Sequence, residues 1–335
     1  MKNYIDKFQG CLLGVAIGDT LGKPFEGKLR EGIHSQFSAF GKFVQENKKL
    51  FDTYTDDTQL TLHTAQALID GNGFKLDSLI AEYVEWLDDP PIGPGYGCIS
   101  AIRKLRYGVP WKEAASNSGG NGSAMRVSPI GLFYMNNMKA LKEAAIGSSV
   151  ITHSHPAASC AAVVVARAIA YLVKQTPKLG FSVDEFFREL LESIQDSQEE
   201  VWQEFIVILQ KVKDNLNVPL ISGLIKFSQI GVYEPYFIQE YLGKAFVHPY
   251  ALSTVACSLF VFLKTLNSFE DCIYALSTAG GDCDTIGAIG GSLAGAYFGK
   301  DNTPDRLIKL VKNHKKILKI ASKLHDTFQN RNKRF

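Results

Sequence analysis

The amino-acid sequence predicts an all-α fold built as one domain. Apolar residues recur three or four positions apart over long stretches, which is the spacing of an amphipathic helix. Runs in which apolar and polar residues alternate are scarce, and residues 41–47, GKFVQEN, are a weak strand candidate. No Pro- or Ser-rich linker and no internal repeat of roughly 20–50 residues divides the chain. We therefore expect a single domain over residues 1–335.

Four segments carry the helical spacing most clearly, and each has an apolar stripe that a helix would turn toward a core. They are residues 56–70, 76–87, 183–194 and 303–328. The last segment is rich in lysine, but its apolar stripe favours a helix docked on the core with a solvated outer face. Residues 174–240 are more polar, and we expect a more variable surface excursion there.

The most apolar stretch, residues 157–173, is interpreted as a buried helix, because it is short for a membrane span and contains Arg167. The N-terminus lacks the apolar core and cleavage site of a signal peptide. The six cysteines lie far apart without a C-x-x-C pair, which favours a reducing compartment. We expect a cytoplasmic protein.

The composition is that of an ordinary globular protein, with 46% apolar and 21% charged residues. The 36 basic and 34 acidic residues leave a net charge of +2. A charge so close to zero gives no bulk attraction to nucleic acid or to a membrane surface. We expect neither as the main partner.

Two short segments place carboxylates beside a hydroxyl where helical runs begin. One holds Thr55, Asp56 and Asp57, and the other extends from Asp282 to Thr285. Taken alone, each is explained by helix capping, since Thr and Asp satisfy the free N–H groups of a first turn. A cap needs only one such residue, however, and four clustered carboxylates would repel one another without a cation.

The ligands offered by these two segments are all oxygens, which suit Mg²⁺, Mn²⁺ or Ca²⁺ rather than zinc. If the segments meet in space, they supply enough ligands for two ions about 3.5–4 Å apart. Small residues in the second helical run would allow close packing of backbones around such a site. They are Gly287, Gly290, Gly291, Ala294 and Gly295.

Residues 18–27, GDTLGKPFEG, contain two further carboxylates. Asp19 is expected to cap or orient this loop. Glu26 lies just beyond Pro24 in a stretch that we expect to be flexible. Taken alone, Glu26 is interpreted as an exposed surface residue, because glutamates are seldom buried.

Three other loops are candidates for ligand binding. Residues 119–123, GGNGS, can direct several N–H groups at one anion, although a plain turn explains them equally well. Pro156 is expected at the first position of a helix, with His153 and His155 either structural or donors to a substrate hydroxyl or phosphate. Tyr96, flanked by glycines, either stacks on a base or anchors the packing.

Together these motifs resemble the ADP-ribosylglycohydrolase family. The matching segments are GCLLGVAIGDTLGKPFEG, YTDDTQLTL, GNGSAMRVSPIGL, ITHSHP and GGDCDTIGAIGGSLAGAYFG, in family order from residue 10 to residue 299. The combination of T-D-D with G-G-D-x-D-T is the most specific part. The resemblance implies an orthogonal multi-helix bundle with a dinuclear Mg²⁺ or Mn²⁺ site at helix N-termini and loops.

The resemblance also implies roles for individual residues. The implied metal ligands are Thr55, Asp56, Asp57, Asp282, Asp284 and Thr285. The implied catalytic residues are Glu26, on a loop beside the metals, and Asp56, Asp57 and Asp284. The implied substrate-binding residues are Gly120, Asn121, Gly122 and Ser123 at the phosphates, with His153 or His155 at the family histidine position; Tyr96 stays a candidate for stacking.

The activity that the resemblance implies is hydrolysis at C1″ of the distal ribose in an ADP-ribosyl conjugate, with release of ADP-ribose. The substrate partner would be an ADP-ribosylated protein or small molecule. Two alternatives stay open: a non-catalytic ADP-ribose-binding or structural protein on the same scaffold, and a dinuclear-metal hydrolase of another ribosyl or phosphate ester. The intact set of six ligands argues against the non-catalytic protein.

Overall fold

The computed structural model describes residues 3–177 and 180–333. Over these residues the regular structure is helical and contains no β-strand, so the predicted all-α class is confirmed. In chain order the helices are α1 (Ile5–Gly22), α2 (Arg30–His34), α3 (Phe40–Glu46), α4 (Asp56–Asp70), α5 (Leu76–Glu85), α6 (Tyr96–Arg106), α7 (Trp111–Ala114), α8 (Ser128–Phe133), α9 (Met138–Val150), α10 (Pro156–Leu172), α11 (Val183–Ile194), α12 (Glu200–Asp214), α13 (Leu220–Phe227), α14 (Ala251–Lys264), α15 (Phe269–Ser277), α16 (Cys283–Phe298), α17 (Asp305–Leu310) and α18 (His314–Asn332).

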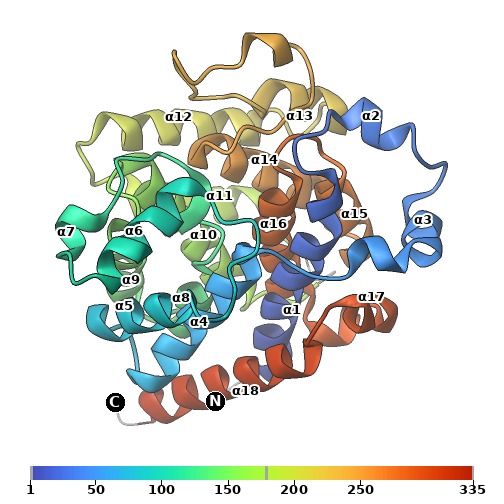
Figure 1. Cartoon of the computed structure of the whole chain (residues 1–335). Helices are drawn as coiled ribbons and strands as arrows, with labels where there is room; N and C mark the ends of the chain where they lie inside the picture. The colour runs from blue at the N-terminus through green and yellow to red at the C-terminus, as the bar shows by residue number, and fades with distance from the viewer. Residues whose placement is uncertain (1–2, 178–179, 334–335) are drawn as a thin grey trace.

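Helices α1 and α16 form the centre of the bundle (Figure 1) and pack against each other more extensively than any other described pair. Their contact is made by backbone rather than by side chains. A Cβ atom added at Gly14 would lie 2.0 Å from the carbonyl oxygen of Gly291, and one at Gly18 would lie 1.9 Å from that of Gly287. Only glycine permits so close an approach. The close backbone packing predicted for the small residues of α16 is therefore present at Gly287, Gly291 and Gly295, while Gly290 packs against the side chain of Leu276.

The two central helices run antiparallel, because Gly10 lies opposite Gly295 while Gly22 lies opposite Cys283. The C-terminal end of α1 is thereby placed against the N-terminal end of α16. Asp19 belongs to the last turn of α1, and Asp284 belongs to the first turn of α16. The packing thus carries acidic residues from both ends of the chain to one edge of the bundle.

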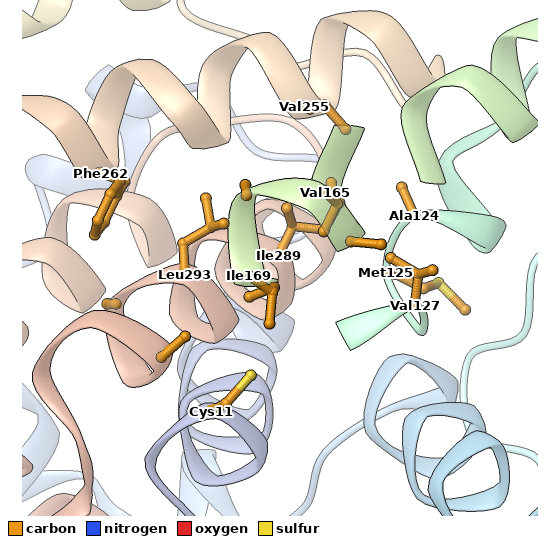
Figure 2. Close-up of a cluster of buried hydrophobic side chains, with 14 of the residues drawn as sticks. Cys11, Ala124, Met125, Val127, Val165, Ile169, Val255, Phe262, Ile289 and Leu293 are labelled. Carbon is orange, nitrogen blue, oxygen red and sulfur yellow. The ribbon is translucent and has the colours of Figure 1, made fainter. Parts of the chain in front are cut away.

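Helix α10 lies against α16 and confirms the prediction of a buried helix over residues 157–173. Figure 2 shows Val165 and Ile169 of α10 next to Ile289 and Leu293 of α16, and all four side chains are fully buried. Arg167 lies on the outer side of α10, where it pairs with a glutamate of α11. No helix among the described residues is long and apolar enough to cross a membrane.

The helical spacing predicted the first and last residues of several helices accurately. Helices α4 and α11 begin and end at the residues expected, and α5 ends two residues early. The lysine-rich segment 303–328 forms two helices, α17 and α18, instead of one. The break falls at Asn313, which has a φ of +58°. Asn is among the few residues that adopt the left-handed conformation readily.

The weak strand candidate at residues 41–47 was wrong, because this segment belongs to helix α3. The helix turns Phe40 and Phe43 toward Phe25, with ring centroids 5.8 and 6.3 Å apart. Side chains three positions apart share one face of a helix but lie on opposite faces of a strand. The aromatic cluster around Phe25 therefore decides the conformation.

Helices α11, α12 and α13 occupy much of the polar segment 174–240. Their apolar faces lie against α10 and α14, and side chains such as Phe186 and Phe205 are fully buried. This part of the segment contributes to the same buried cluster as the central helices. The single-domain organisation and the greater variability of the segment stay predictions.

The glycine contact generates a first prediction. Gly14→Ala should lower the free energy of unfolding by about 1–3 kcal/mol, the cost of overpacking a close contact. The matched control is Gly32→Ala in helix α2, where an added Cβ meets nothing within 4 Å and should stabilise by about 0.5–1 kcal/mol. Urea denaturation measures both. Equal unfolding midpoints for the two variants would show that the backbone contact is looser than described.

Candidate functional site

A cleft of about 890 Å³ opens at the edge where α1 and α16 bring their acidic residues together. Its wall combines the N-terminal turns of α4 and α16 with loops that precede α6, α10 and α14. The predicted site residues that line it are Glu26, Asp56, Asp57, Tyr96, Gly120, Asn121, Gly122, His153, His155, Asp282, Asp284 and Thr285. Thr55 and Ser123 do not line it; both are buried.

Asp19 holds the first turn of α4 from the neighbouring helix. Its carboxylate accepts hydrogen bonds from the backbone N–H of Thr55 at 2.9 and 3.0 Å. It also accepts from the backbone N–H of Thr58 at 3.0 Å and from the Thr58 hydroxyl at 2.5 Å. Burial raises the pKa of Asp19 to about 6, although these hydrogen bonds favour the charged form. Asp19 therefore orients the first turn of α4 through these hydrogen bonds.

The two acidic segments meet at Asp57. Its Oδ2 accepts hydrogen bonds from the hydroxyls of Thr55, at 3.1 Å, and Thr285, at 3.4 Å. Thr55 precedes α4 and Thr285 lies in the first turn of α16, so one carboxylate joins both helices. Oδ1 of Asp57 is buried and has no hydrogen-bond partner among the described residues. An unpaired buried carboxylate oxygen is costly and calls for a ligand.

Helix capping explains only part of these segments. Thr55 does cap α4, since its hydroxyl accepts the N–H of Asp57 at 3.3 Å. Asp282 occupies the N-cap position of α16 but makes no cap hydrogen bond. Its carboxylate accepts instead from the side-chain amide of Asn121 at 2.6 Å. Asp284 accepts the N–H of its neighbour Thr285, at 3.0 Å. These segments therefore contain more carboxylates than are needed to cap α4 and α16.

Burial and mutual repulsion raise the pKa values of three of these carboxyls. Burial is the main cause at Asp56, Asp57 and Asp284, and the next cause is a neighbouring carboxylate: Asp19 for the first two and Asp282 for the third. The nearest buried cation is Arg126, whose charge opposes the rise in the pKa of Asp56. A cation among these oxygens would relieve the repulsion.

The donor set fits Mg²⁺ or Mn²⁺, because it consists of carboxylate and hydroxyl oxygens and includes an oxygen without a partner. Among the described residues, no three His, Cys, Asp or Glu side chains form a group that could hold one metal ion. The threonine hydroxyls and water would therefore have to contribute to any coordination shell.

Glu26 lies at the rim of the cleft, on a loop that is fixed against the start of α16. The N–H of Gly27 donates to the carbonyl of Gly281, and the N–H of Gly281 donates to the carbonyl of Lys28, both at 2.9 Å. Partial burial and then the charge of Asp282 raise the pKa of Glu26. The glutamate is thus exposed, as expected from sequence alone, but it also faces the acidic floor.

The predicted phosphate loop forms one wall of the cleft. Its backbone is fixed by the N–H of Asn121, which donates to the carbonyl of Pro249 at 3.1 Å. Gly122 lies against the imidazole of His153, where an added Cβ would be 2.8 Å from the ring. The side chain of Ser123 points away from the cleft and accepts from the hydroxyl of Ser149 at 2.9 Å. A phosphate contact of this segment stays a prediction.

The two predicted histidines differ in their surroundings. His155 precedes α10, its Nδ1 accepts the N–H of Ala157 at 3.1 Å, and Pro156 is the first helical residue, as predicted. His153 is buried, and burial, followed by the charge of Arg126, lowers its pKa to about 3. Both rings reach the cleft.

Three tyrosines stand at the mouth of the cleft. Tyr96 is 86% exposed, so its interpretation as a packing anchor was wrong. Tyr233 and Tyr236, which we did not predict, are 67% and 75% exposed. His248 and Tyr250 also line the cleft and were missed. The run His-Pro-Tyr before α14 repeats the His-Pro start of α10 and could have been noticed.

Comparison with known proteins finds one family along the chain. The model of the ADP-ribosylglycohydrolase family matches residues 1–334. The chain is similar to ADP-ribosylhydrolase ARH3 of Mus musculus, with 27% identity over 97% of this chain and 92% of the mouse protein. It is also similar to ADP-ribosyl-[dinitrogen reductase] glycohydrolase of Rhodospirillum rubrum, with 24% identity over 89% and 88% of the two chains.

A solved structure described as an ADP-ribosylglycohydrolase-related protein complex has the same fold, with a TM-score of 0.69 at 23% identity over 98% of this chain and 100% of that chain. The family match extends from the first helix to the last and includes every element that lines the cleft. The chain belongs to the ADP-ribosylglycohydrolase family.

Proposed function

We propose that this protein hydrolyses the bond at C1″ of the distal ribose in an ADP-ribosyl conjugate, releases ADP-ribose, and uses two Mg²⁺ or Mn²⁺ ions. Family membership and the hydrolase names of its relatives support an enzyme of this class. The substrate would be a protein or small molecule that carries ADP-ribose.

One observation carries the proposal. A buried carboxylate, Asp57, links the first turns of α4 and α16 and keeps one oxygen without a partner, at the floor of a cleft large enough for a nucleotide. Two more buried carboxyls, Asp56 and Asp284, share that floor. Such concentrated negative charge destabilises a fold unless it serves to bind positive charge.

The residues that would hold the ions are Thr55, Asp56, Asp57, Asp282, Asp284 and Thr285. When bound, the ions would supply positive charge that orients the ribose hydroxyls and lowers the pKa of a water molecule. Asp19 would keep the ligands of α4 in place, since it binds the backbone on both sides of them.

The chain's own carboxylates would also act on the reacting sugar. Positive charge develops on the ribose ring as the bond at C1″ breaks, and nearby carboxylates stabilise it. Glu26 faces the floor from the rim and is assigned as the general base that accepts a proton from the attacking water. The loop from Gly120 to Ser123 and the exposed Tyr96 would hold the rest of the ADP-ribose.

The experiment that tests this function offers the protein three conjugates, ADP-ribosylated on arginine, on serine and on acidic side chains, with Mg²⁺ and with a chelator. Metal-dependent release of ADP-ribose from at least one conjugate supports the proposal and identifies the linkage. Binding of ADP-ribose without release would favour the non-catalytic alternative. Metal-dependent hydrolysis of another ester without ADP-ribose as product would favour the other hydrolase.

The role of Glu26 gives a second prediction. Glu26→Gln should bind ADP-ribose about as well as the wild type but hydrolyse conjugates about 10²–10⁴-fold more slowly, the usual cost of losing one acid–base group. The matched control is Glu31→Gln, an exposed residue of α2, which should keep the wild-type rate. A Glu26→Gln enzyme that retains more than half of that rate would exclude a chemical role.

The acidic floor gives a third prediction. Mg²⁺ at 100 times its Kd should stabilise the wild type by about 2.7 kcal/mol, because it binds only the folded state. Asp284→Asn should keep the metal-free fold, since it relieves repulsion, but lose most of that gain. Asp77→Asn, which alters an exposed acid in the first turn of α5, should keep the gain. Thermal melts with and without Mg²⁺ measure all three. A wild type that Mg²⁺ does not shift, or a full shift in Asp284→Asn, would contradict the metal assignment.

A further inference from the structure

His153 offers one ring nitrogen to the protein and the other to the cleft. Its Nδ1 lies 2.8 Å from the hydroxyl oxygen of Thr152. Its Nε2 borders the predicted phosphate loop, where a Cβ added at Gly122 would lie 3.1 Å away. The hydrogen bonds made among the described residues leave Nε2 free of any protein partner. In the neutral ring only one nitrogen carries a proton. Whether that proton is on Nδ1 therefore decides whether Nε2 of His153 accepts a hydrogen bond from a ligand or donates one to it.

Arg126 donates a hydrogen bond to the Thr152 hydroxyl, whose oxygen must therefore accept. Nη2 of Arg126 lies 2.5 Å from Thr152 Oγ1, and a guanidinium can only donate. The single hydroxyl hydrogen of Thr152 then has two possible acceptors. One is Nδ1 of His153, at 2.8 Å, and the other is the carbonyl of Ser149, at 3.4 Å.

The carbonyl of Ser149 is the poorer acceptor. It already receives the backbone N–H of Thr152 at 3.1 Å and that of His153 at 2.9 Å, which occupy both of its lone pairs. A third donor at 3.4 Å is beyond the usual range for a hydroxyl donor. The Thr152 hydroxyl therefore donates to Nδ1 of His153, and a neutral imidazole that accepts at Nδ1 carries its proton at Nε2.

We propose that Arg126 and Thr152 form a relay that fixes His153 as the Nε2–H tautomer, so that it presents a neutral hydrogen-bond donor to an oxygen of the ligand beside Gly122. Arg126 and Thr152 are positioning residues, because they act through His153. The relay itself is a property of the ligand-free protein. The contact of His153 with ADP-ribose rests on the proposed function.

The surroundings of Arg126 make the relay rigid. Its guanidinium is fully buried and lies 4.6 Å from the ring centroid of Tyr83. It also donates to the sulfur of Cys98 at 3.1 Å and to the carbonyl of Ser148 at 3.2 Å. A fixed cation beside His153 also disfavours a second positive charge, so the ring stays neutral, and the hydrogen bond from Thr152 then selects one of its two tautomers.

Nitrogen-15 NMR of histidine-labelled ligand-free protein tests the relay directly, with the His153 signals assigned by their loss in His153→Gln. The wild type should show a single tautomer, protonated at Nε2. Thr152→Val should show exchange-averaged tautomers, and Thr152→Ser, which restores the hydroxyl, should return to one. Protonation at Nδ1 in the wild type, averaged tautomers in the wild type, or a Thr152→Val spectrum like that of the wild type would each overturn the proposal.

Calorimetric titration with ADP-ribose tests the consequence. Thr152→Val should weaken binding roughly three- to tenfold, the range for one neutral hydrogen bond, and Thr152→Ser should restore it. In a His153→Ala background Thr152→Val should cause no further loss, because Thr152 acts through the missing ring. An equal loss in both backgrounds would show a purely structural role and overturn the proposal. A protein that does not bind ADP-ribose at all would contradict the proposed function, while the NMR result still decides the relay.

Discussion

Helices α1 and α16 touch through glycine backbones, and the position of the whole acidic floor depends on that contact. Side chains between two helices normally keep their axes about 8–10 Å apart. Here an added Cβ at Gly18 or Gly287 would fall within 2.3 Å of a carbonyl oxygen of the other helix. Asp19 follows Gly18 directly, and Asp284 lies less than one turn before Gly287. The steric limit on backbone approach thus sets how the end of one helix meets the start of the other.

The charge balance of the cleft follows from this geometry. The first turns of α4 and α16 offer free N–H groups and the positive end of a helix dipole, which favour nearby carboxylates. The chain places more acids there than these groups can satisfy, and Arg126 is the nearest buried cation described. Functional sites commonly retain such unfavourable arrangements at the expense of stability. The dense glycine and apolar packing around α10 and α16 provides the support that this arrangement needs.

Much of the fold could be predicted from the sequence, because periodic apolar residues report directly on helices such as α4 and α11. The two errors in helical elements have local causes. An aromatic cluster overrode the alternating pattern of residues 41–47, and Asn313 broke the segment 303–328, whose single proline, Pro304, lies near its start and does not mark the break. For the site, the two carboxylate clusters pointed to a metal site, while the roles of Glu26, the glycine loop and the histidines came from the family resemblance. The sequence could not show that Ser123 points away from the cleft or that Tyr233 reaches its mouth, since both depend on how distant segments of the chain pack together. The role of the Thr152 hydroxyl could not be predicted either, because a threonine beside a histidine is not a recognisable sequence motif.

The pairing of α1 with α16 also has a consequence for how the chain reaches its native state. The two helices lie near opposite ends of the sequence, and the glycine face of α1 finds its described partner only once α16 exists. Contacts between residues so far apart carry a large loop-closure entropy and slow the folding of a domain. During synthesis, α1 leaves the ribosome long before α16, so its glycine face has no partner helix until α16 has also emerged. The acidic cleft can therefore be completed only after α16 has been synthesised and has packed against α1.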